Sequence, residues 1–315
     1  MNHPLTFRAQ SSGTISVGQP KGKNLRIFFP SHEKIIEGPM TKILDGIDMN
    51  PHIQLCDSED LADLIFLSVD TNRLDRFNPK KWNFDKTVFL DLRDSTKLVP
   101  IHVKYYFKRS CLDTSKKIFK AYPRKVFHIA YPIRKEYFEH SQPPTLQDQR
   151  AIDISCFFDV DVNTLRGRVA KKIMDEHSWN KKHVGIVGMN KRVGRNTFQQ
   201  QYFEIMKRSR IVVTCNPDRW EGDYRLYEAI SSGALVLCDR LYLKQRHNFV
   251  DQQHLIFYDD IEDMVEKVQY YLQHEHERFS IAQAGYEFGI TYHLPSSRIQ
   301  EIVDTIFPDR LSGEN

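Results

Sequence analysis

The segment from residue 211 to residue 239, IVVTCNPDRWEGDYRLYEAISSGALVLCD, constrains the fold more than any other part of the chain. An apolar run at each of its ends has the composition of a strand buried on both faces. A polar loop and a helical stretch that begins at Tyr224 lie between these two runs. A strand, a helix and a second strand in this order predict a parallel α/β sheet.

Similar apolar runs recur along the chain and predict strands at residues 25–29, 64–69, 87–92, 126–131, 154–158, 183–187 and 255–258. Apolar residues at helical spacing predict amphipathic helices at residues 165–177, 198–206, 261–272 and 299–306. Near-continuous apolar strands that alternate with helices favour parallel sheets covered on both faces. We therefore predict an α/β protein with two doubly wound, Rossmann-like domains that face a cleft, with ligands at the carboxyl edges of the sheets.

Length and local composition predict the domain boundaries. A chain of 315 residues exceeds the usual size of a single core, so two domains of about 150 residues are expected. The polar stretch SQPPTLQDQR at 141–150 has two prolines and no periodicity, which is typical of a linker. The predicted organisation is a flexible arm, an N-terminal domain, a C-terminal ligand-binding domain and a last helix that can pack back on the first domain, at residues 1–23, 24–145, 146–295 and 296–315.

Charge and cysteine usage exclude several classes of protein. A net charge of +4 suits anionic small ligands or an acidic surface, but it is too diffuse to identify the protein as a nucleic-acid binder. The five cysteines are odd in number and widely scattered, which indicates a reducing compartment without a disulfide framework. No apolar run approaches the ~18 residues of a membrane span, and the first residues lack the apolar core of a signal peptide. We expect a cytoplasmic protein with no integral membrane segment.

Arg225 and Glu228 carry the chemistry of the 211–239 segment. They are three positions apart, so they lie on one face of the predicted helix near its N-terminus. Free N–H groups and a positive partial charge at that end suit a diphosphate. Arg225 can bind two phosphate oxygens, and Glu228 can accept hydrogen bonds from a ribose diol. The pattern predicts a nucleotide-sugar site, and its alternative is a solvated salt bridge between the two side chains.

Two sequence patterns extend this interpretation: YxxxMxxSRIVV at 202–213 and RLYEAISSGALVLCD at 225–239. Together they resemble the donor-binding domain of GT-B glycosyltransferases, in particular the C-terminal domains of the group-1 and exostosin-like members. The stretch LIFYDDIEDMVEKVQYYL at 255–272 is similar to the strand and helix that follow in that family. Shorter similarities, DLRD at 91–94 and YFKR at 106–109, extend the resemblance into the first half of the chain.

The resemblance implies transfer of a hexose or pentose from a nucleoside-diphosphate sugar to a hydroxyl group of a glycan or glycoconjugate, with no metal or other cofactor. In that reaction Arg225 holds the diphosphate and Glu228 the ribose hydroxyls. Many group-1 relatives have two glutamates with seven residues between them, whereas Glu221 and Glu228 have six, so no role passes to Glu221. The predicted donor-binding residues are Arg192, Asp223, Tyr224, Arg225, Glu228 and Gly233.

A base for the acceptor hydroxyl is expected from the N-terminal, acceptor-side domain. His32 directly follows the first predicted strand, where a neutral imidazole can take a proton. Asp91 and Asp94 follow another strand, and a cap or a salt bridge with Arg93 is the alternative role for one of them. His32 and Asp94 are the predicted catalytic residues.

Three other motifs have weaker functional interpretations. The DVD motif at 159–161 is similar to the metal-binding signature of the other glycosyltransferase architecture, but a capping cluster before the next helix is favoured. The GIVG motif at 185–188 lacks the third glycine and the acidic residue of a dinucleotide fingerprint. The HEHE motif at 274–277 lies at a helix end and has no metal-ligand partners at useful spacing, so a solvated face is expected.

Two other functions stay open. One is a nucleotide-sugar or glycan-binding protein without turnover, and release of free nucleoside diphosphate distinguishes it from the enzyme. The other is sugar transfer to a nucleic-acid base, which the small positive charge permits but does not favour. A steep loss of activity with salt would indicate this second function.

Overall fold

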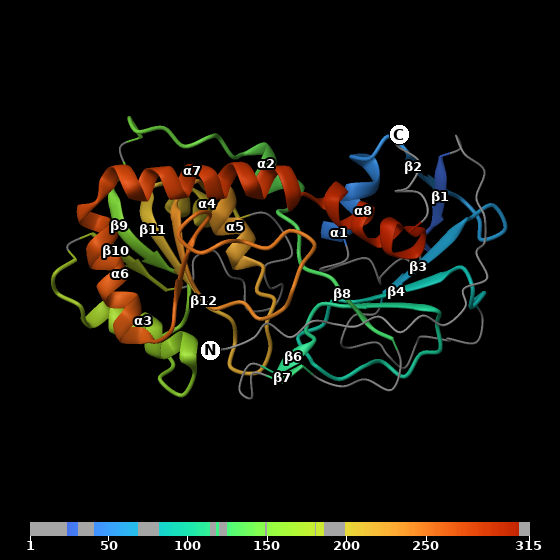
Figure 1. Ribbon diagram of the computed structural model, residues 1–315, viewed down its shortest axis with the longest axis horizontal. Coiled ribbons are helices and arrows are strands. Elements are labelled where there is room, and N and C mark those ends of the chain that lie inside the picture. Colours follow the sequence, from blue (N-terminus) through green and yellow to red (C-terminus); the bar gives the residue numbers. More distant parts are fainter. Residues whose placement is uncertain are drawn as a thin grey trace.

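Two parallel sheets, one in each half of the chain, form the framework of the computed structural model (Figure 1). They confirm the predicted α/β class with two doubly wound domains. His32 and Arg192 lie outside the part of the chain that the structure describes. The described residues are 24–30, 41–68, 82–113, 118–119, 125–148, 150–179, 181–185 and 199–308.

The first sheet has the strand order β2-β1-β3-β4-β5-β8, and its paired strands are parallel. Four strands match predicted runs, while β2 and β5 have no counterpart among the predictions because neither is a continuous apolar run. Helix α1 precedes β2, and a short antiparallel pair, β6 and β7, follows β5. The bounds are β1 (Leu25–Phe28), α1 (Thr41–Asp48), β2 (Ile53–Cys56), β3 (Leu64–Ser68), β4 (Thr87–Asp91), β5 (Tyr105–Lys108), β6 (Leu112–Asp113), β7 (Ile118–Phe119) and β8 (Phe127–His128).

The second sheet has the order β10-β9-β11-β12-β13 and is also parallel. The strand order reverses beside β9, and in such sheets ligands bind at the carboxyl edge near that reversal. The bounds are α2 (Lys135–Glu139), β9 (Ile152–Cys156), α3 (Leu165–Asp175), β10 (Lys182–Val184), α4 (Gln200–Lys207), β11 (Ser209–Thr214), α5 (Arg225–Ser231), β12 (Leu235–Asp239), β13 (Ile256–Tyr258), α6 (Ile261–Gln273), α7 (Glu275–Tyr292) and α8 (Pro295–Ile306).

The 211–239 segment folds as predicted, as strand β11, helix α5 and strand β12. The two strands pair in parallel, with Ile211 opposite Leu235 and Thr214 opposite Cys238. Both strands are buried almost throughout, which explains why they appear in the sequence as unbroken apolar runs. Helix α5 returns the chain from the carboxyl end of β11 to the amino end of β12.

One apolar core runs through both domains. A single cluster of buried side chains extends from β1 and β3 of the first sheet, through α5, to the last helix α8. Each sheet also has its own cluster on its other face, one around Phe89 and Tyr106 and one around Ile154 and Val213. The shared cluster means that the two domains are packed together over an apolar interface.

Two chain segments connect the domains. Residues 131–134 lead into α2, whose Tyr137 packs edge-to-face on Phe203 of the second domain with ring centroids 4.9 Å apart. The chain therefore reaches the second domain before the polar stretch 141–150. It returns after α7, where the Ile133 amide donates to the His293 carbonyl at 2.7 Å. The two connecting segments thus lie side by side.

The last helix packs on the first domain. Helix α8 lies against α1, as Figure 1 shows. At their contact a Cβ on Gly46 would lie 2.2 Å from the Pro295 carbonyl oxygen, so only glycine permits this approach. No helix among the described residues has both the length and the apolar character needed to cross a membrane.

Candidate functional site

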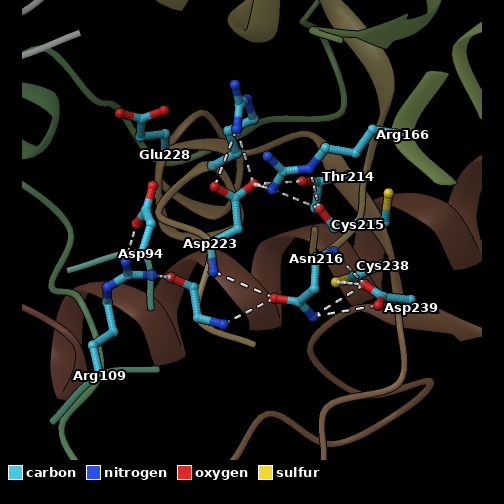
Figure 2. A network of polar contacts seen from close by, with 12 residues as sticks. Asp94, Arg109, Arg166, Thr214, Cys215, Asn216, Asp223, Glu228, Cys238 and Asp239 are labelled. Atoms are coloured by element: carbon cyan, nitrogen blue, oxygen red, sulfur yellow. Dashed lines mark hydrogen bonds and ion pairs between the residues drawn. The ribbon is translucent and has the colours of Figure 1, made fainter. Parts of the chain in front are cut away.

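The loop that joins β11 to α5 lies at the carboxyl edge of the second sheet, next to the strand-order reversal. Asp223, near the end of this loop, is buried and binds two arginines. Its Oδ2 lies 2.8 Å from Nη2 of Arg166 in α3, and its Oδ1 lies 3.1 Å from Nη1 of Arg225. Figure 2 shows Asp223 and Arg166 in this network. Two guanidinium groups from different elements therefore meet at one carboxylate.

Arg225, the first residue of α5, is held among aromatic rings. Its guanidinium carbon lies 5.3 Å from the centroid of Phe158 and 5.5 Å from that of Tyr224. Burial disfavours the positive charge, but the Asp223 carboxylate outweighs burial and raises the pKa of Arg225. No hydrogen-bond partner of its Nε lies among the described residues. Arg225 is thus a permanently charged group with donor capacity left for a ligand.

Glu228 lies one turn further along α5, and only 2% of its surface is exposed. The phenol of Tyr202, from α4, donates a hydrogen bond to its Oε2 at 2.8 Å. Arg225 pairs with Asp223 and both α5 side chains are buried, so the alternative of a solvated salt bridge on the helix surface does not apply. Because α5 has only 7 residues, we assign the positive charge of the site to the arginines rather than to the helix dipole.

A second set of hydrogen bonds fixes the loop itself. The Oδ1 of Asn216 accepts from the amides of Gly222 (3.0 Å) and Asp223 (3.3 Å). The backbone amide of Asn216 donates a hydrogen bond to the Asp239 carboxylate at 2.9 Å, and the side-chain amide of Asn216 donates to the same carboxylate. Burial raises the pKa of Asp239, and the Asn216 hydrogen bonds oppose that shift. The loop is therefore tied to the end of β12, which positions Asp223 (Figure 2).

Arg109, just after β5, connects the loop to the first domain. Its Nη1 donates to the Gly222 carbonyl at 2.5 Å, and its Nε donates to the Leu92 carbonyl at 3.1 Å. The guanidinium stacks between the rings of Tyr131 and Trp220, with centroids at 4.6 and 4.4 Å. Arg109 is fully buried. Arg109 was not among the predicted site residues, yet it makes the main polar contact between the domains at this site.

Gly222 is required at this contact. Its φ of +118° is a backbone conformation that other residues rarely adopt. A Cβ at this position would also lie 3.1 Å from Cγ of Arg109. The glycine therefore allows the loop to turn while its carbonyl faces the arginine of the other domain.

Asp94, a predicted catalytic residue, lies in the loop after β4 at the carboxyl edge of the first sheet. Its carboxylate forms an ion pair with Nη2 of Arg109, and 67% of its side chain is exposed. The structure therefore brings Asp94 to the interdomain contact beside Gly222. Its predicted role as a base stays a prediction.

Tyr224, a predicted donor-binding residue, also lies between the domains. Its ring packs edge-to-face on Tyr131 of the first domain, with centroids 5.8 Å apart. Tyr224 thus contributes to the interdomain contact and to the aromatic surroundings of Arg225.

Gly233, a predicted donor-binding residue, lies apart from Asp223 and Arg225. It follows the C-terminal end of α5, at the amino edge of β12, whereas Asp223 and Arg225 lie at the opposite, carboxyl edge. Its φ of +69° ends the helix, and a Cβ there would lie 3.1 Å from Arg150 Nη2. The glycine has a structural role because a helix must reverse the chain before the next parallel strand.

Glu221 has a structural environment. Its carboxylate accepts hydrogen bonds from the amides of Tyr242 (2.7 Å) and Leu243 (2.8 Å) in the loop after β12. Burial raises the pKa of Glu221 to about 7, although these two hydrogen bonds oppose the shift. Glu221 also lines a small cavity together with His128 of the first domain.

The DVD motif at 159–161, an alternative site considered in the sequence, lies in a described part of the structure. The Asp161 side chain accepts hydrogen bonds from the backbone and side chain of Asn163, and Thr164 caps α3 by accepting from the Gly167 amide. The side chain that caps the helix is thus Thr164 and not a residue of the 159–161 motif, whose Asp161 instead binds the turn before the helix. Within the described ranges no group of three or more His, Cys, Asp or Glu side chains is arranged to hold a metal ion.

Comparison with known proteins agrees with this geometry. Residues 160–304 match the model of a family described as "Glycosyl transferase-like". No curated protein matches the sequence.

Several solved structures share the fold. An alpha-glucosyltransferase in complex with UDP has a TM-score of 0.60 at 12% identity, covering 90% of this chain and 99% of that chain. An alpha-glucosyltransferase in complex with UDP and a 13-mer DNA containing a HMU base has a TM-score of 0.57 at 11% identity, covering 90% and 100%. AviGT4, a glycosyltransferase involved in avilamycin A biosynthesis, has a TM-score of 0.53 at 9% identity, covering 92% and 99%. Residues 160–304 thus resemble a glycosyltransferase family, and the similar structures show that the chain has the GT-B fold of two Rossmann-like domains.

Proposed function

We propose that this protein is a glycosyltransferase that uses a UDP-sugar as donor and binds its diphosphate beside Arg166 and Arg225. The arrangement of these two guanidinium groups around Asp223, at the carboxyl edge that faces the first domain, is the observation that carries the proposal. The similar structures that contain UDP support the choice of nucleotide. Glu228, oriented by Tyr202, is proposed to accept hydrogen bonds from the ribose hydroxyls.

The arginines suit the charge that develops during transfer. When the bond between the sugar and the diphosphate breaks, negative charge increases on the leaving group. Positive groups placed beforehand stabilise that charge without reorganisation. Arg225 stays charged because Asp223 raises its pKa, and Phe158 and Tyr224 limit its side-chain movement. In this proposal the two arginines take the part that a divalent cation plays in metal-dependent transferases.

We place the acceptor on the first-domain side of the cleft, and we propose a hydroxyl group of a glycan or glycoconjugate. We propose Asp94 as the base that takes the proton of this hydroxyl group, because its carboxylate is exposed and lies next to the loop that carries Asp223. Asp94→Asn is then expected to lower transfer to the acceptor by about 100-fold while UDP-sugar binding is retained.

A nucleic-acid base is a second candidate acceptor. Among the structures with the same fold are alpha-glucosyltransferases in complex with DNA. The two acceptors predict different salt dependence, since neutralised phosphates release counterions on binding. Activity on a DNA acceptor would fall steeply between low and physiological salt, whereas activity on a neutral glycan would change little.

The donor proposal is tested by measuring UDP release from a panel of UDP-sugars, together with the thermal shift that each donor produces. We expect at least one UDP-sugar to raise the melting temperature and to be slowly hydrolysed. Arg225→Met is expected to abolish most of both effects, with a loss in unliganded stability of about 1–3 kcal/mol because Arg166 still pairs with Asp223.

Arg240→Met is the matched control, because Arg240 is an exposed arginine paired with Asp259 away from the loop. It is expected to behave like the unmodified protein. If no UDP-sugar stabilises the protein or releases UDP, or if the two variants behave alike, the proposed donor site is wrong.

A further inference from the structure

A second polar cavity lies at the amino edge of the second sheet, opposite the Asp223 site. Its volume is about 400 Å³, within the range of small-molecule sites. The segment before β9, the first residues of β11 and β12 and the first turns of α7 line it. Figure 1 shows the segment between α2 and β9 running alongside α7. None of the residues discussed for sugar transfer belongs to this cavity except Gly233, which lies apart from Asp223 and Arg225.

Positive charge is in excess in this cavity. Its lining contains two carboxylates, Asp148 and Glu275, and four cationic side chains, which leaves an excess of two positive charges. The cationic side chains come from four separate parts of the domain: Arg150, Lys181, Arg210 and Arg278.

Arg150 is a largely buried cation, with 14% of its side chain exposed, whose charge is poorly compensated. Its guanidinium donates to the carbonyl oxygens of Ser209 (2.9 Å) and Ser232 (3.3 Å). Its ion pair with Asp148 spans 4.0 Å, and Asp148 already accepts two hydrogen bonds from Thr145. A buried charge without a close counter-ion is costly. The guanidinium is therefore well placed to gain from an added anion.

Arg278 adds a second buried guanidinium from α7. It donates to the Tyr271 carbonyl at 2.8 Å and to Glu275, whose own side chain is 66% exposed. Burial lowers the pKa of Arg150 to about 10, and burial also lowers the pKa of Arg278, with a contribution from nearby Arg210. By contrast, the pKa of Arg240 is raised by its hydrogen bond to Asp259. Burial, together with repulsion by a neighbouring arginine, thus outweighs the carboxylate contacts of Arg150 and Arg278.

The two other cations are accessible. Arg210 pairs with Asp153 at 3.2 Å, and 40% of its side chain is exposed. Lys181 is exposed, and its ammonium group has no ion pair within the described part of the chain. Leu235, Phe279 and Ala282 supply an apolar wall on the same cavity.

We propose that this cavity binds a small organic phosphate, with the phosphate group among the four cationic side chains and the apolar part of the ligand against Leu235 and Phe279. A doubly charged phosphate offsets the excess of two positive charges, and its oxygens suit the paired donors of guanidinium groups. The site is independent of the donor site, because the two lie at opposite edges of the sheet.

Calorimetric titration with phenyl phosphate tests this proposal, since the probe combines a phosphate with an apolar ring and lacks a nucleoside. We expect saturable binding that Lys181→Met and Arg210→Met each weaken about tenfold. These variants remove exposed side chains, whereas Arg150→Met would also remove the hydrogen bonds to Ser209 and Ser232 and so change stability together with binding. Leu146→Trp, at an exposed lining position, is expected to block binding by filling the cavity without changing its charge.

Arg225→Met and Arg240→Met are the matched controls, and both are expected to bind phenyl phosphate normally. Loss of binding in Arg225→Met would place the phosphate in the donor site and overturn the proposal. The absence of saturable binding, or equal binding by the Lys181 and Arg210 variants and the unmodified protein, would overturn it as well. Because the readout is binding, failure here leaves the proposed sugar transfer untouched.

Discussion

Each sheet of this protein carries a carboxylate between two cations at its carboxyl edge, but the two clusters differ in burial. In the first sheet Asp91 contacts Lys108 at 3.0 Å and Arg93 at 2.8 Å, and the side chains of Asp91 and Lys108 have no exposed surface. In the second sheet Asp223 contacts Arg166 and Arg225, whose side chains are 20% and 12% exposed. The two clusters contain similar types of side chain, but their carboxylates and cations differ in exposure to solvent.

The first cluster is closed by further hydrogen bonds. Tyr106 donates to Asp91 at 2.6 Å and accepts from the Val99 amide at 2.9 Å. Burial disfavours the charge of Asp91, but Arg93, Lys108 and Tyr106 outweigh burial and lower its pKa. The cluster satisfies its own charges, and neither Asp91 nor Lys108 has exposed surface, so we interpret it as structural. The comparison teaches that burial, rather than residue type, separates a structural ion cluster from a binding site.

The largest expected effect breaks the first cluster. Asp91→Asn leaves the buried Lys108 ammonium without its carboxylate, and we expect a loss of about 3–5 kcal/mol in the free energy of unfolding. Chemical denaturation measures it. The double variant with Lys108→Met is expected to recover much of the loss. Equal stability of the single variant and the unmodified protein would contradict the structural role.

Arg166→Met tests the second cluster with a similar change. Because Arg166 is partly exposed and Arg225 still pairs with Asp223, we expect stability to fall by only about 1–3 kcal/mol. We expect kcat/KM for the donor to fall about 100-fold, since one positive group is lost from the leaving diphosphate. A variant that loses stability but keeps its kcat/KM would show that this cluster is structural too.

Glu221, in the loop that joins β11 to α5, predicts how the stability of the protein depends on pH. Its pKa is about 7 in the folded protein, above the ordinary value of 4.5, so the folded state retains a proton that the unfolded state has lost. Stability due to this group is therefore greater at pH 6 than at pH 8, by about 1.4 kcal/mol. We expect chemical denaturation to show that the change in the free energy of unfolding between pH 6 and pH 8 is smaller by about 1.4 kcal/mol in Glu221→Gln than in the unmodified protein. An unchanged pH dependence in the variant would contradict the assignment.

The smallest expected effect concerns the contact between the regions. Arg109→Lys keeps the charge but loses the forked hydrogen bonds and the stacking between Tyr131 and Trp220. We expect the KM for the donor to rise about fivefold, with kcat changed less, because the lysine positions Gly222 less firmly. Steady-state kinetics checks this split. A fall in kcat at constant KM would instead indicate a direct part in the chemistry.

Much of the fold can be predicted because its strands are buried on both faces. The runs at β3, β4, β11 and β12 are nearly all apolar, and each was predicted as a strand. Strand β2 could not be predicted, since only Ile53 among its residues is buried. Helix α7 could not be predicted either, because its buried residues include Arg278 and two glycines and give no simple apolar stripe.

The site was predictable only where its residues are neighbours in the chain. Asp223, Arg225 and Glu228 belong to one short segment, so their spacing carried information. Arg166 lies 57 positions before Asp223, counted along the printed numbering, and Arg109 lies still further away. Only the tertiary fold brings their guanidinium groups to the same loop.

By itself, the sequence determined the strand–helix–strand unit and the type of chemistry at its loop, because local periodicity and side-chain type are properties of neighbouring residues. The tertiary structure decided which ion cluster is closed and which is open, that Gly233 lies at the other edge of the sheet, and that Arg109 joins the domains. These features depend on burial and on contacts between distant residues, and both exist only when the chain is folded.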